Sequence, residues 1–97
     1  YKADIARFHF TLYRAASRPA AVRLIEALWL QTGPYMNYLF PDYLKISVGP
    51  KQRGQICRAI RRRDAAAVRR AIETDLTTAL SYIADRLETE QPDAAAA

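Results

Sequence analysis

Apolar residues recur every three or four positions along most of this chain, and the longest such series follows Asp64. A period of about 3.6 residues places all of these positions on one side of an α-helix, whereas a strand alternates at every second residue. The repeat therefore predicts a helix of about five turns whose apolar side packs against other helices. Its members are Val68, Ile72, Asp75, Leu76, Ala79, Ile83 and Leu87.

The same period predicts three shorter helices earlier in the chain. They span approximately residues 2–16, 18–40 and 50–63, and a connection with proline turns covers residues 41–50. Because short connections between helices favour antiparallel neighbours, the predicted fold class is an all-α antiparallel helical bundle. The residues expected to face its core are Ile5, Phe8, His9, Leu12, Val22, Ile25, Leu28, Trp29, Arg53, Ile56, Cys57 and Ile60.

Residues that begin or interrupt helices mark the expected boundaries. Ser17 is expected to cap the second helix, whose first turn tolerates Pro19. The Gly33-Pro34 pair is expected to kink that helix, which then continues to about Phe40 because the following residues stay apolar. Asp64 is expected to cap the last helix.

The length and composition of the chain allow one small folded domain. Of the 97 residues, 51% are apolar and 26% are charged, a balance typical of a folded soluble protein. We expect residues 1–90 to form the domain and residues 91–97 to form a flexible tail. Because the chain starts inside a helical pattern and without a methionine, we expect its true N-terminus to lie upstream.

Several classes of protein are excluded by the sequence. The longest apolar stretch, residues 20–30, is interrupted by Arg23 and Glu26, so neither a membrane span nor a signal peptide is predicted. The single cysteine, Cys57, excludes an internal disulfide and indicates a cytoplasmic protein. The three glycines of the chain cannot build a glycine-rich phosphate loop. No nucleophile–base pair or cofactor motif is visible, so we expect no enzymatic activity and no cofactor.

Three polar residues occupy positions that the helical period assigns to the buried side: His9, Arg53 and Asp75. Burying a charge is costly unless the charge is paired. Because the three residues come from three different helices, they can converge on one point inside a bundle, where helical proteins build ligand and metal sites. The alternatives are a hydrogen-bonded core histidine for His9 and a solvent-directed side chain for Arg53. Asp75 is the hardest to assign to the surface, because its neighbours along the stripe are apolar on both sides.

The net charge of +5 is concentrated in the middle of the chain. Residues 51–75 contain eight basic and three acidic side chains, and twelve of the fifteen basic residues of the chain are arginines. Arginine favours bidentate contacts with phosphate, so an alternative function is a small basic nucleic-acid-binding module. A solvated helix face is the simpler interpretation, because no aromatic residues are interleaved with these arginines. The arginines concerned are Arg58, Arg61, Arg62, Arg63, Arg69 and Arg70.

Four segments in the right order and spacing resemble the C-terminal domain of FadR-type regulators in the GntR transcription factor superfamily. Residues 8–19 are similar to the family's F-H-x-x-L…A-x-x-N-P segment, and residues 28–35 to its second long helix. Residues 56–64 match its I-x-x-A-I-x-x-x-D stretch, and the last helix is similar to its closing A…H-L segment. The resemblance covers residues 4–87.

The resemblance implies an effector-binding and dimerising domain of a DNA-binding transcription regulator. In many members a pocket inside the bundle holds a divalent metal through one Asp or Asn and three His, and binds small carboxylates. The resemblance also implies further bundle helices upstream and an N-terminal winged helix domain that would bind DNA, so we expect this chain to be a fragment of the regulator. We therefore expect a cytoplasmic homodimer that binds a small-molecule effector and no membrane, with large side chains of the second helix at the dimer contact. Those side chains are Leu24, Leu30, Tyr38 and Phe40.

The chain departs from the family pattern at most of the implied metal ligands. The first ligand position holds Ile5, with Asp4 one residue out of register, and the first histidine position holds His9. The second histidine position holds Arg53 and the last holds Asp75. A guanidinium repels a cation and cannot coordinate one, so the pocket is predicted to be free of metal.

Arg53 and Asp75 carry opposite charges at positions that approach a common metal in the family pattern. We expect them to pair directly or through water, with His9 within hydrogen-bonding reach. An anionic effector would then compete with Asp75 for Arg53, and Tyr35 and Tyr38 would supply polar groups of the pocket wall. The predicted ligand-binding residues are thus His9, Arg53, Asp75, Tyr35 and Tyr38.

Overall fold

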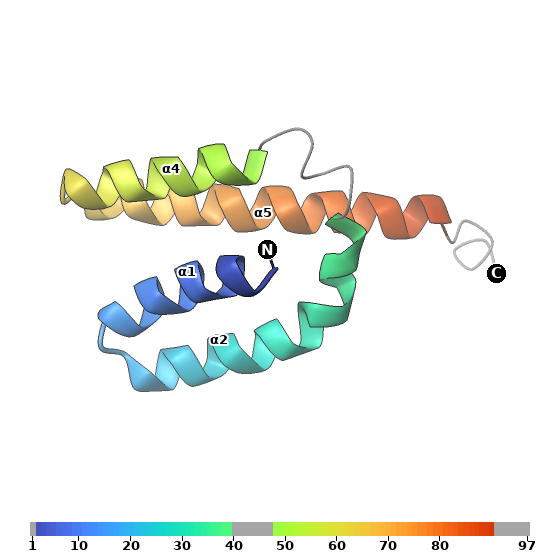
Figure 1. Ribbon diagram of the computed structural model, residues 1–97, viewed down its shortest axis with the longest axis horizontal. Coiled ribbons are helices and arrows are strands. Elements are labelled where there is room, and N and C mark those ends of the chain that lie inside the picture. The colour runs from blue at the N-terminus through green and yellow to red at the C-terminus, as the bar shows by residue number, and fades with distance from the viewer. Residues whose placement is uncertain (1, 40–47, 91–97) are drawn as a thin grey trace. The chain divides into compact units, whose positions relative to one another are not determined.

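The computed structural model describes residues 2–39 and 48–90, and every regular element in these two ranges is a helix (Figure 1). The elements in chain order are α1 (Lys2–Ala15), α2 (Pro19–Thr32), η1 (Gly33–Leu39), α4 (Val48–Arg61) and α5 (Ala65–Glu90). They form two compact units, residues 1–34 and residues 35–97. The all-α prediction is confirmed. The predicted end of the second helix at Phe40, most of the predicted connection and the predicted tail lie outside the described residues.

An aromatic cluster joins α1 and α2 in the first unit. The ring of Trp29 on α2 lies 5.5 Å from the His9 ring and 5.2 Å from the Phe10 ring, between ring centroids. Tyr13, one turn further along α1, lies within 6.0 Å of both of those α1 rings. Tilted and edge-on aromatic pairs of this kind contribute about 0.5–1.5 kcal/mol each beyond the area that they bury. The cluster is therefore the main side-chain link between the two helices.

The turn between α1 and α2 differs from the prediction that Ser17 caps α2. The N-cap residue is Arg18, which makes no side-chain capping bond. Ser17 instead ends α1, because its φ of 55° places it in the left-handed region and its N–H donates to the carbonyl of Arg14. The physical reason is Pro19: the residue before a proline is driven out of the helical region, so position 18 takes the extended N-cap conformation.

The chain continues as a helix beyond Gly33-Pro34, as predicted, but the helix type changes. Gly33 has right-handed helical dihedral angles (φ −48°, ψ −50°), and η1 is a 3-10 helix rather than a kinked α-helix. Pro34 has no N–H to donate to the carbonyl one turn back, so the α-helical bond pattern of α2 cannot pass through it. A tighter 3-10 helix is a frequent result at the end of an α-helix.

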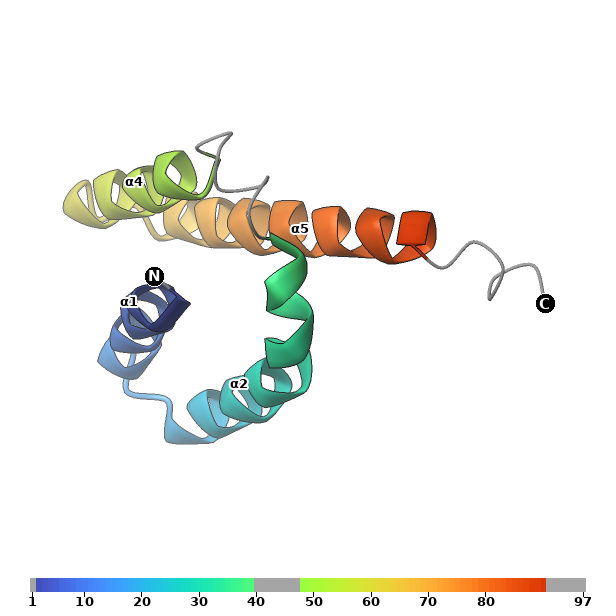
Figure 2. The same cartoon turned by 45° about the vertical axis from the view of Figure 1, so that its right-hand side comes forward.

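The second unit is built on α4 and α5, which run side by side in opposite directions in both views (Figures 1 and 2). The α4 side chains at their interface are Ile56 and Ala59, which are 0% and 1% exposed. α4 begins at Val48, two residues before the start predicted at Pro50. Pro50 therefore lies in the first turn of the helix, where its missing N–H has no consequence. Further along α5, Ile83 packs against Leu39 of η1.

Three residues expected in the core are exposed instead: Leu28, Ile60 and Leu76. Leu28 is 60% exposed, Ile60 42% and Leu76 38%. All three lie at the edge of an apolar stripe, and a single packed neighbour covers less of a helix surface than the full width of such a stripe. The period thus identified the correct side of each helix but overestimated how much of that side is buried.

Two side-chain and backbone features define the sharp reversal between α4 and α5. Arg63 has a φ of 55° and its N–H donates to the carbonyl of Ile60, while the N–H of Asp64 donates to the carbonyl of Ala59. These two bonds form a Schellman motif that closes α4. Asp64 Oδ1 then accepts from the N–H of Ala67 at 3.0 Å, which confirms Asp64 as the N-cap of α5.

The Asp64 cap leads to a stability prediction. Replacing Asp64 with Ala leaves the N–H of Ala67 without its side-chain acceptor, so we expect a loss of about 1 kcal/mol in the free energy of unfolding. This corresponds to a fall in Tm of about 4–8 °C for a domain of this size. Asp64→Asn is the control, because asparagine caps equally well and should keep the Tm of the wild-type chain. An Ala variant as stable as the Asn variant would contradict the capping role.

Candidate functional site

A buried polar cluster lies at the interface of α4 and α5. Gln52 on α4 and Asp75 on α5 are 9% and 7% exposed, although their neighbours along each helix face are apolar. Gln52 Nε2 donates to Thr78 Oγ1 on α5 at 3.2 Å, so a side-chain hydrogen bond crosses between the two helices at this level. Asp75 comes three residues before Thr78, so it lies on the same side of α5, one turn away. Gln52 and Asp75 therefore share one region of the interface.

Arg53 follows Gln52 in the first turns of α4, and Gly49 makes room for its guanidinium. A Cβ atom added at Gly49 would lie 3.0 Å from Arg53 Nη1 and 3.6 Å from Arg53 Cζ. Gly49 is buried and Arg53 is half-buried, so the guanidinium lies back over the start of its own helix rather than extending into solvent. The unpaired N–H groups of a helix N-terminus add positive potential at this place. The arrangement favours an anion next to Arg53.

Arg53 and Asp75, which the sequence analysis expects to pair, are brought into the same unit on helices that pack against each other. The prediction that both belong to one polar site is consistent with this placement. Their direct or water-mediated ion pair stays a prediction.

His9 is 2% exposed and belongs to the first unit. Its Nδ1 lies 2.9 Å from the carbonyl oxygen of Ile5, one turn earlier on α1. Because a carbonyl oxygen only accepts, Nδ1 donates in this bond. The rings of Phe8, Tyr13 and Trp29 surround the imidazole, with centroid distances of 5.4–6.0 Å. These are the contacts of a hydrogen-bonded core histidine; the convergence of His9 with Arg53 and Asp75 stays a prediction.

Both candidate tyrosines lie on η1, in the same unit as Arg53 and Asp75. Tyr35 is 47% exposed. Tyr38 is half-buried and packs against the cluster formed by Leu39 and Ile83. Their proposed role as polar groups of a pocket wall stays a prediction.

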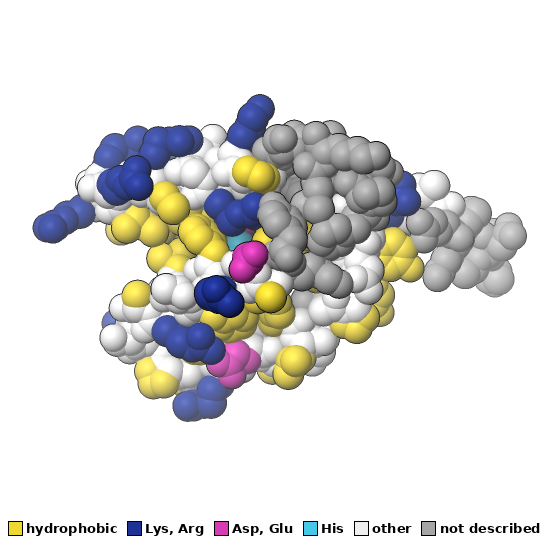
Figure 3. Space-filling view, in the orientation of Figure 1, with side chains coloured by type: hydrophobic (Ala, Val, Ile, Leu, Met, Phe, Trp, Pro, Cys, Tyr) yellow, Lys and Arg dark blue, Asp and Glu magenta, His cyan; other side chains and the backbone are white. Residues whose placement is uncertain are grey.

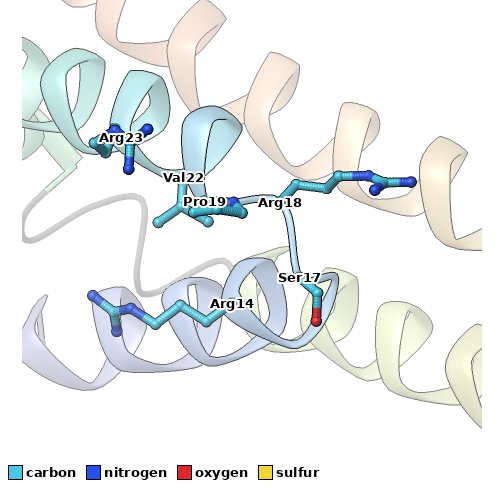
Figure 4. Close-up of a pocket in the computed structure, with 6 residues that line it drawn as sticks. All are labelled: Arg14, Ser17, Arg18, Pro19, Val22 and Arg23. Atoms are coloured by element: carbon cyan, nitrogen blue, oxygen red, sulfur yellow. The ribbon is translucent and has the colours of Figure 1, made fainter.

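A hollow at the turn between α1 and α2, which the sequence did not predict, is a weaker candidate (Figure 4). It has a volume of about 310 Å³ and an apolar floor formed by Pro19 and Val22. Of its three arginines, Arg14 already pairs with Glu26 at 3.5 Å, and Figure 4 shows that Arg18 points away from Arg14. No buried polar side chain lines the hollow, so nothing in it selects a ligand. Its lining residues are Arg14, Ser17, Arg18, Pro19, Val22 and Arg23.

The arginines of the alternative nucleic-acid hypothesis lie around the turn between α4 and α5, and all six are exposed. Figure 3 shows Lys and Arg side chains gathered at this end of the helix pair. Arg69 Nε donates to Glu73 Oε1 at 2.8 Å, and this hydrogen bond together with the negative charge of Glu73 raises the pKa of Arg69. Both partners of this pair are in water, where such a contact adds little stability. Binding of nucleic acid by this surface stays a prediction.

The described ranges contain no group of three or more His, Cys, Asp and Glu side chains that could hold a metal ion. Cys57 is a free thiol. No helix in the part of the chain that the structure describes is both long and apolar enough to cross a membrane.

Sequence reasoning missed Gly49, Gln52 and Thr78. A signal for Gln52 was available, because it precedes Ile56 by four residues and so continues the buried side of α4. Thr78 follows Asp75 by three residues, which also places it on the packed side of α5. The role of Gly49 depends on the direction of the Arg53 side chain and has no signal in the sequence.

The family model of the FCD domain matches residues 2–78, which include α1, α2, η1, α4 and the polar cluster of α5. No curated protein and no solved structure matches the chain. Because the match covers more than half of the chain, we conclude that the chain belongs to the FCD family, the FadR C-terminal domain that binds effectors and mediates oligomerisation in GntR-family transcription regulators.

Proposed function

We propose that this domain senses a small organic anion at the α4–α5 polar cluster without using a metal. The observation that carries the proposal is the half-buried Arg53 guanidinium, which lies over Gly49 on the helix pair that also buries Gln52 and Asp75. A cation at the edge of an apolar interface binds a carboxylate far more strongly than one in open water, because the local dielectric is lower.

Arg53 is the residue that recognises the anion in this proposal. A planar guanidinium can donate two parallel hydrogen bonds to a carboxylate, which gives orientation as well as affinity. The effector carboxylate competes with Asp75 for this cation. Tyr35 and Tyr38 provide further polar contacts, and His9 is included because it occupies the family's first histidine position.

The regulatory consequence follows from where the cluster lies. An effector that takes the place of Asp75 changes the polar contacts at the interface of α4 with α5, and with them the relative stability of two packings of this helix pair. Coupling between an effector and a distant site typically amounts to about 1–3 kcal/mol, which a single exchanged ion pair can supply. In the full regulator, we place DNA binding in a separate winged helix domain and the protein in the cytoplasm.

The first test of this function uses two arginines on α4. We expect small mono- and dicarboxylates to raise the Tm of the wild-type chain, because a ligand that binds only the folded state stabilises it. Arg53→Met should weaken the binding of those acids by about tenfold or more, which is the typical effect of removing one charge-assisted contact. Isothermal titration calorimetry measures the affinity.

The matched control is Arg58→Met. Arg58 lies on the same helix and also approaches a glycine four residues earlier, with Nη1 3.4 Å from a Cβ added at Gly54, but it is exposed. This variant should bind the acids as the wild-type chain does. Equal affinities for the wild-type, Arg53→Met and Arg58→Met chains would contradict the role of Arg53.

The second test concerns metal ions. Ile5 and Arg53 stand where the family pattern places two of four ligands, so we expect no tightly bound transition metal. Protein purified without any chelator should contain far less than one zinc, nickel or manganese ion per molecule by elemental analysis. Adding EDTA should leave the response to carboxylates unchanged. About one metal ion per chain, or loss of the response in EDTA, would show that the pocket is metal-dependent.

We also propose that two copies of the chain associate through α2. Five of its residues form a side without charges, which begins at the exposed edge of the stripe with Val22 and Trp29 and continues around the helix away from it, and all five are exposed. A helix that is apolar on both sides is normally covered on both. Of the residues expected at this contact, Leu24 and Leu30 are 69% and 79% exposed, Tyr38 is half-buried, and Phe40 lies outside the described residues. The side consists of Ala20, Ala21, Leu24, Ala27 and Leu28.

A charge on this face tests the association. The wild-type chain should have the mass of a dimer by light scattering at high micromolar concentration. The double variant Leu24→Glu/Leu28→Glu should have the mass of a monomer, because it buries two unpaired carboxylates at the contact. Thr77→Glu, at an exposed position on α5, is the control and should remain dimeric. A monomeric wild-type chain would exclude the proposal.

A further inference from the structure

Gln52 has one amide atom for which residues 2–39 and 48–90 offer no hydrogen-bond partner. The side chain is 9% exposed, and its Nε2 donates to Thr78 Oγ1 at 3.2 Å. Its Oε1 is fully buried and accepts no hydrogen bond from these described residues. Buried polar atoms are almost always paired in folded proteins, so an orphan of this kind requires an explanation.

The fold itself gives no reason for a glutamine at this position. Gln52 lies on the side of α4 that also carries Ile56, which is fully buried, and an apolar side chain would suit such a position. Its single bond to Thr78 does not use the acceptor oxygen. The oxygen therefore calls for a donor that the described part of the chain does not supply.

The surroundings of Gln52 indicate what that group is. Arg53, the next residue of α4, presents a guanidinium over the first turn, and this cation selects an anion. Gln52 Oε1 is a pure acceptor, so it selects a hydrogen-bond donor. The guanidinium lies over Gly49, which precedes Gln52 by three residues and so lies on the same side of α4 as Gln52. A single small molecule that carries both groups can therefore reach both.

We infer that Gln52 Oε1 accepts a hydrogen bond from a hydroxyl or amino group of the effector, so that the domain prefers a hydroxy- or amino-substituted carboxylate over the plain acid. This inference rests on the proposed function, since it assigns the carboxylate to Arg53. It makes Gln52 a specificity-determining residue. An acid without a donor group leaves the buried oxygen unpaired, whereas an acid with one satisfies it, and this difference is the source of the discrimination.

The test compares acids of one chain length by calorimetry on the full chain. The probes are butyrate, its 2-hydroxy, 3-hydroxy and 2-amino derivatives, and 2-oxobutyrate, which offers an acceptor where the hydroxy acid offers a donor. We expect at least one of the hydroxy or amino acids to bind about tenfold or more tightly than both butyrate and 2-oxobutyrate.

Two glutamine variants identify the residue responsible. In Gln52→Leu the preference over butyrate should fall to within about twofold, because the acceptor is gone. The Tm of this variant without ligand should stay within about 4 °C of the wild-type value, since an apolar side chain suits the position. Gln55→Leu is the control: Gln55 lies on the same helix, three residues further on and exposed, and its loss should leave the preference intact.

The outcomes separate this inference from the proposed function. Equal binding of butyrate and its derivatives, a preference for 2-oxobutyrate, or a preference that persists in Gln52→Leu would overturn the role of Gln52 while leaving carboxylate binding at Arg53 in place. A large fall in the Tm of Gln52→Leu would show that Gln52 is structural. Failure of every acid to bind would instead contradict the proposed function itself.

Discussion

The packing of α4 against α5 is the interaction on which the rest of the second unit depends. Ile56 and Ala59 are buried almost completely at this interface, and the Schellman motif with the Asp64 cap brings the two helices back to back over a three-residue turn. An interface of this kind excludes water, so each polar side chain within it must find a partner in the protein or in a ligand. The polar cluster has chemical meaning only because its surroundings are apolar.

Two arginines on α4 show how burial decides which charge can act. Arg53 and Arg58 each follow a glycine by four residues, and each guanidinium approaches that glycine. Arg58 is exposed near the end of the helix, where water and salt screen its charge. Arg53 is half-buried at the beginning of the helix, where the backbone dipoles add to its field. The six exposed arginines around the turn contribute most of the charge, yet Arg53 is the cation that the proposed function uses.

The family match and the packing divide α5 into two parts. The match ends at residue 78 and so includes Asp75 and Thr78, the α5 residues of the polar cluster. Residues 79–90 lie beyond it and carry Ile83, which forms a separate apolar cluster with Leu39 of η1. The first part of α5 therefore contains residues of the candidate site. Its second part packs against η1, the element that carries Tyr35 and Tyr38.

The sequence by itself determined the helices, the Asp64 cap, and the polar positions at His9, Arg53 and Asp75, because these depend on residue spacing and on contacts within a few residues. Two helix boundaries were predicted wrongly, although their causes are also local. Pro19 makes Arg18 rather than Ser17 the N-cap of α2, and Pro34 makes η1 a 3-10 helix rather than a kinked α-helix. Only the tertiary structure decided which part of each apolar stripe is covered, and it exposed Leu76 while burying Asp75 beside it. It also paired Gln52 with Thr78, 26 residues away along the chain, and left Gln52 Oε1 without a donor among the residues that the structure describes. Periodicity gives the direction of a side chain, but its partners depend on the register between two helices, which side-chain packing sets.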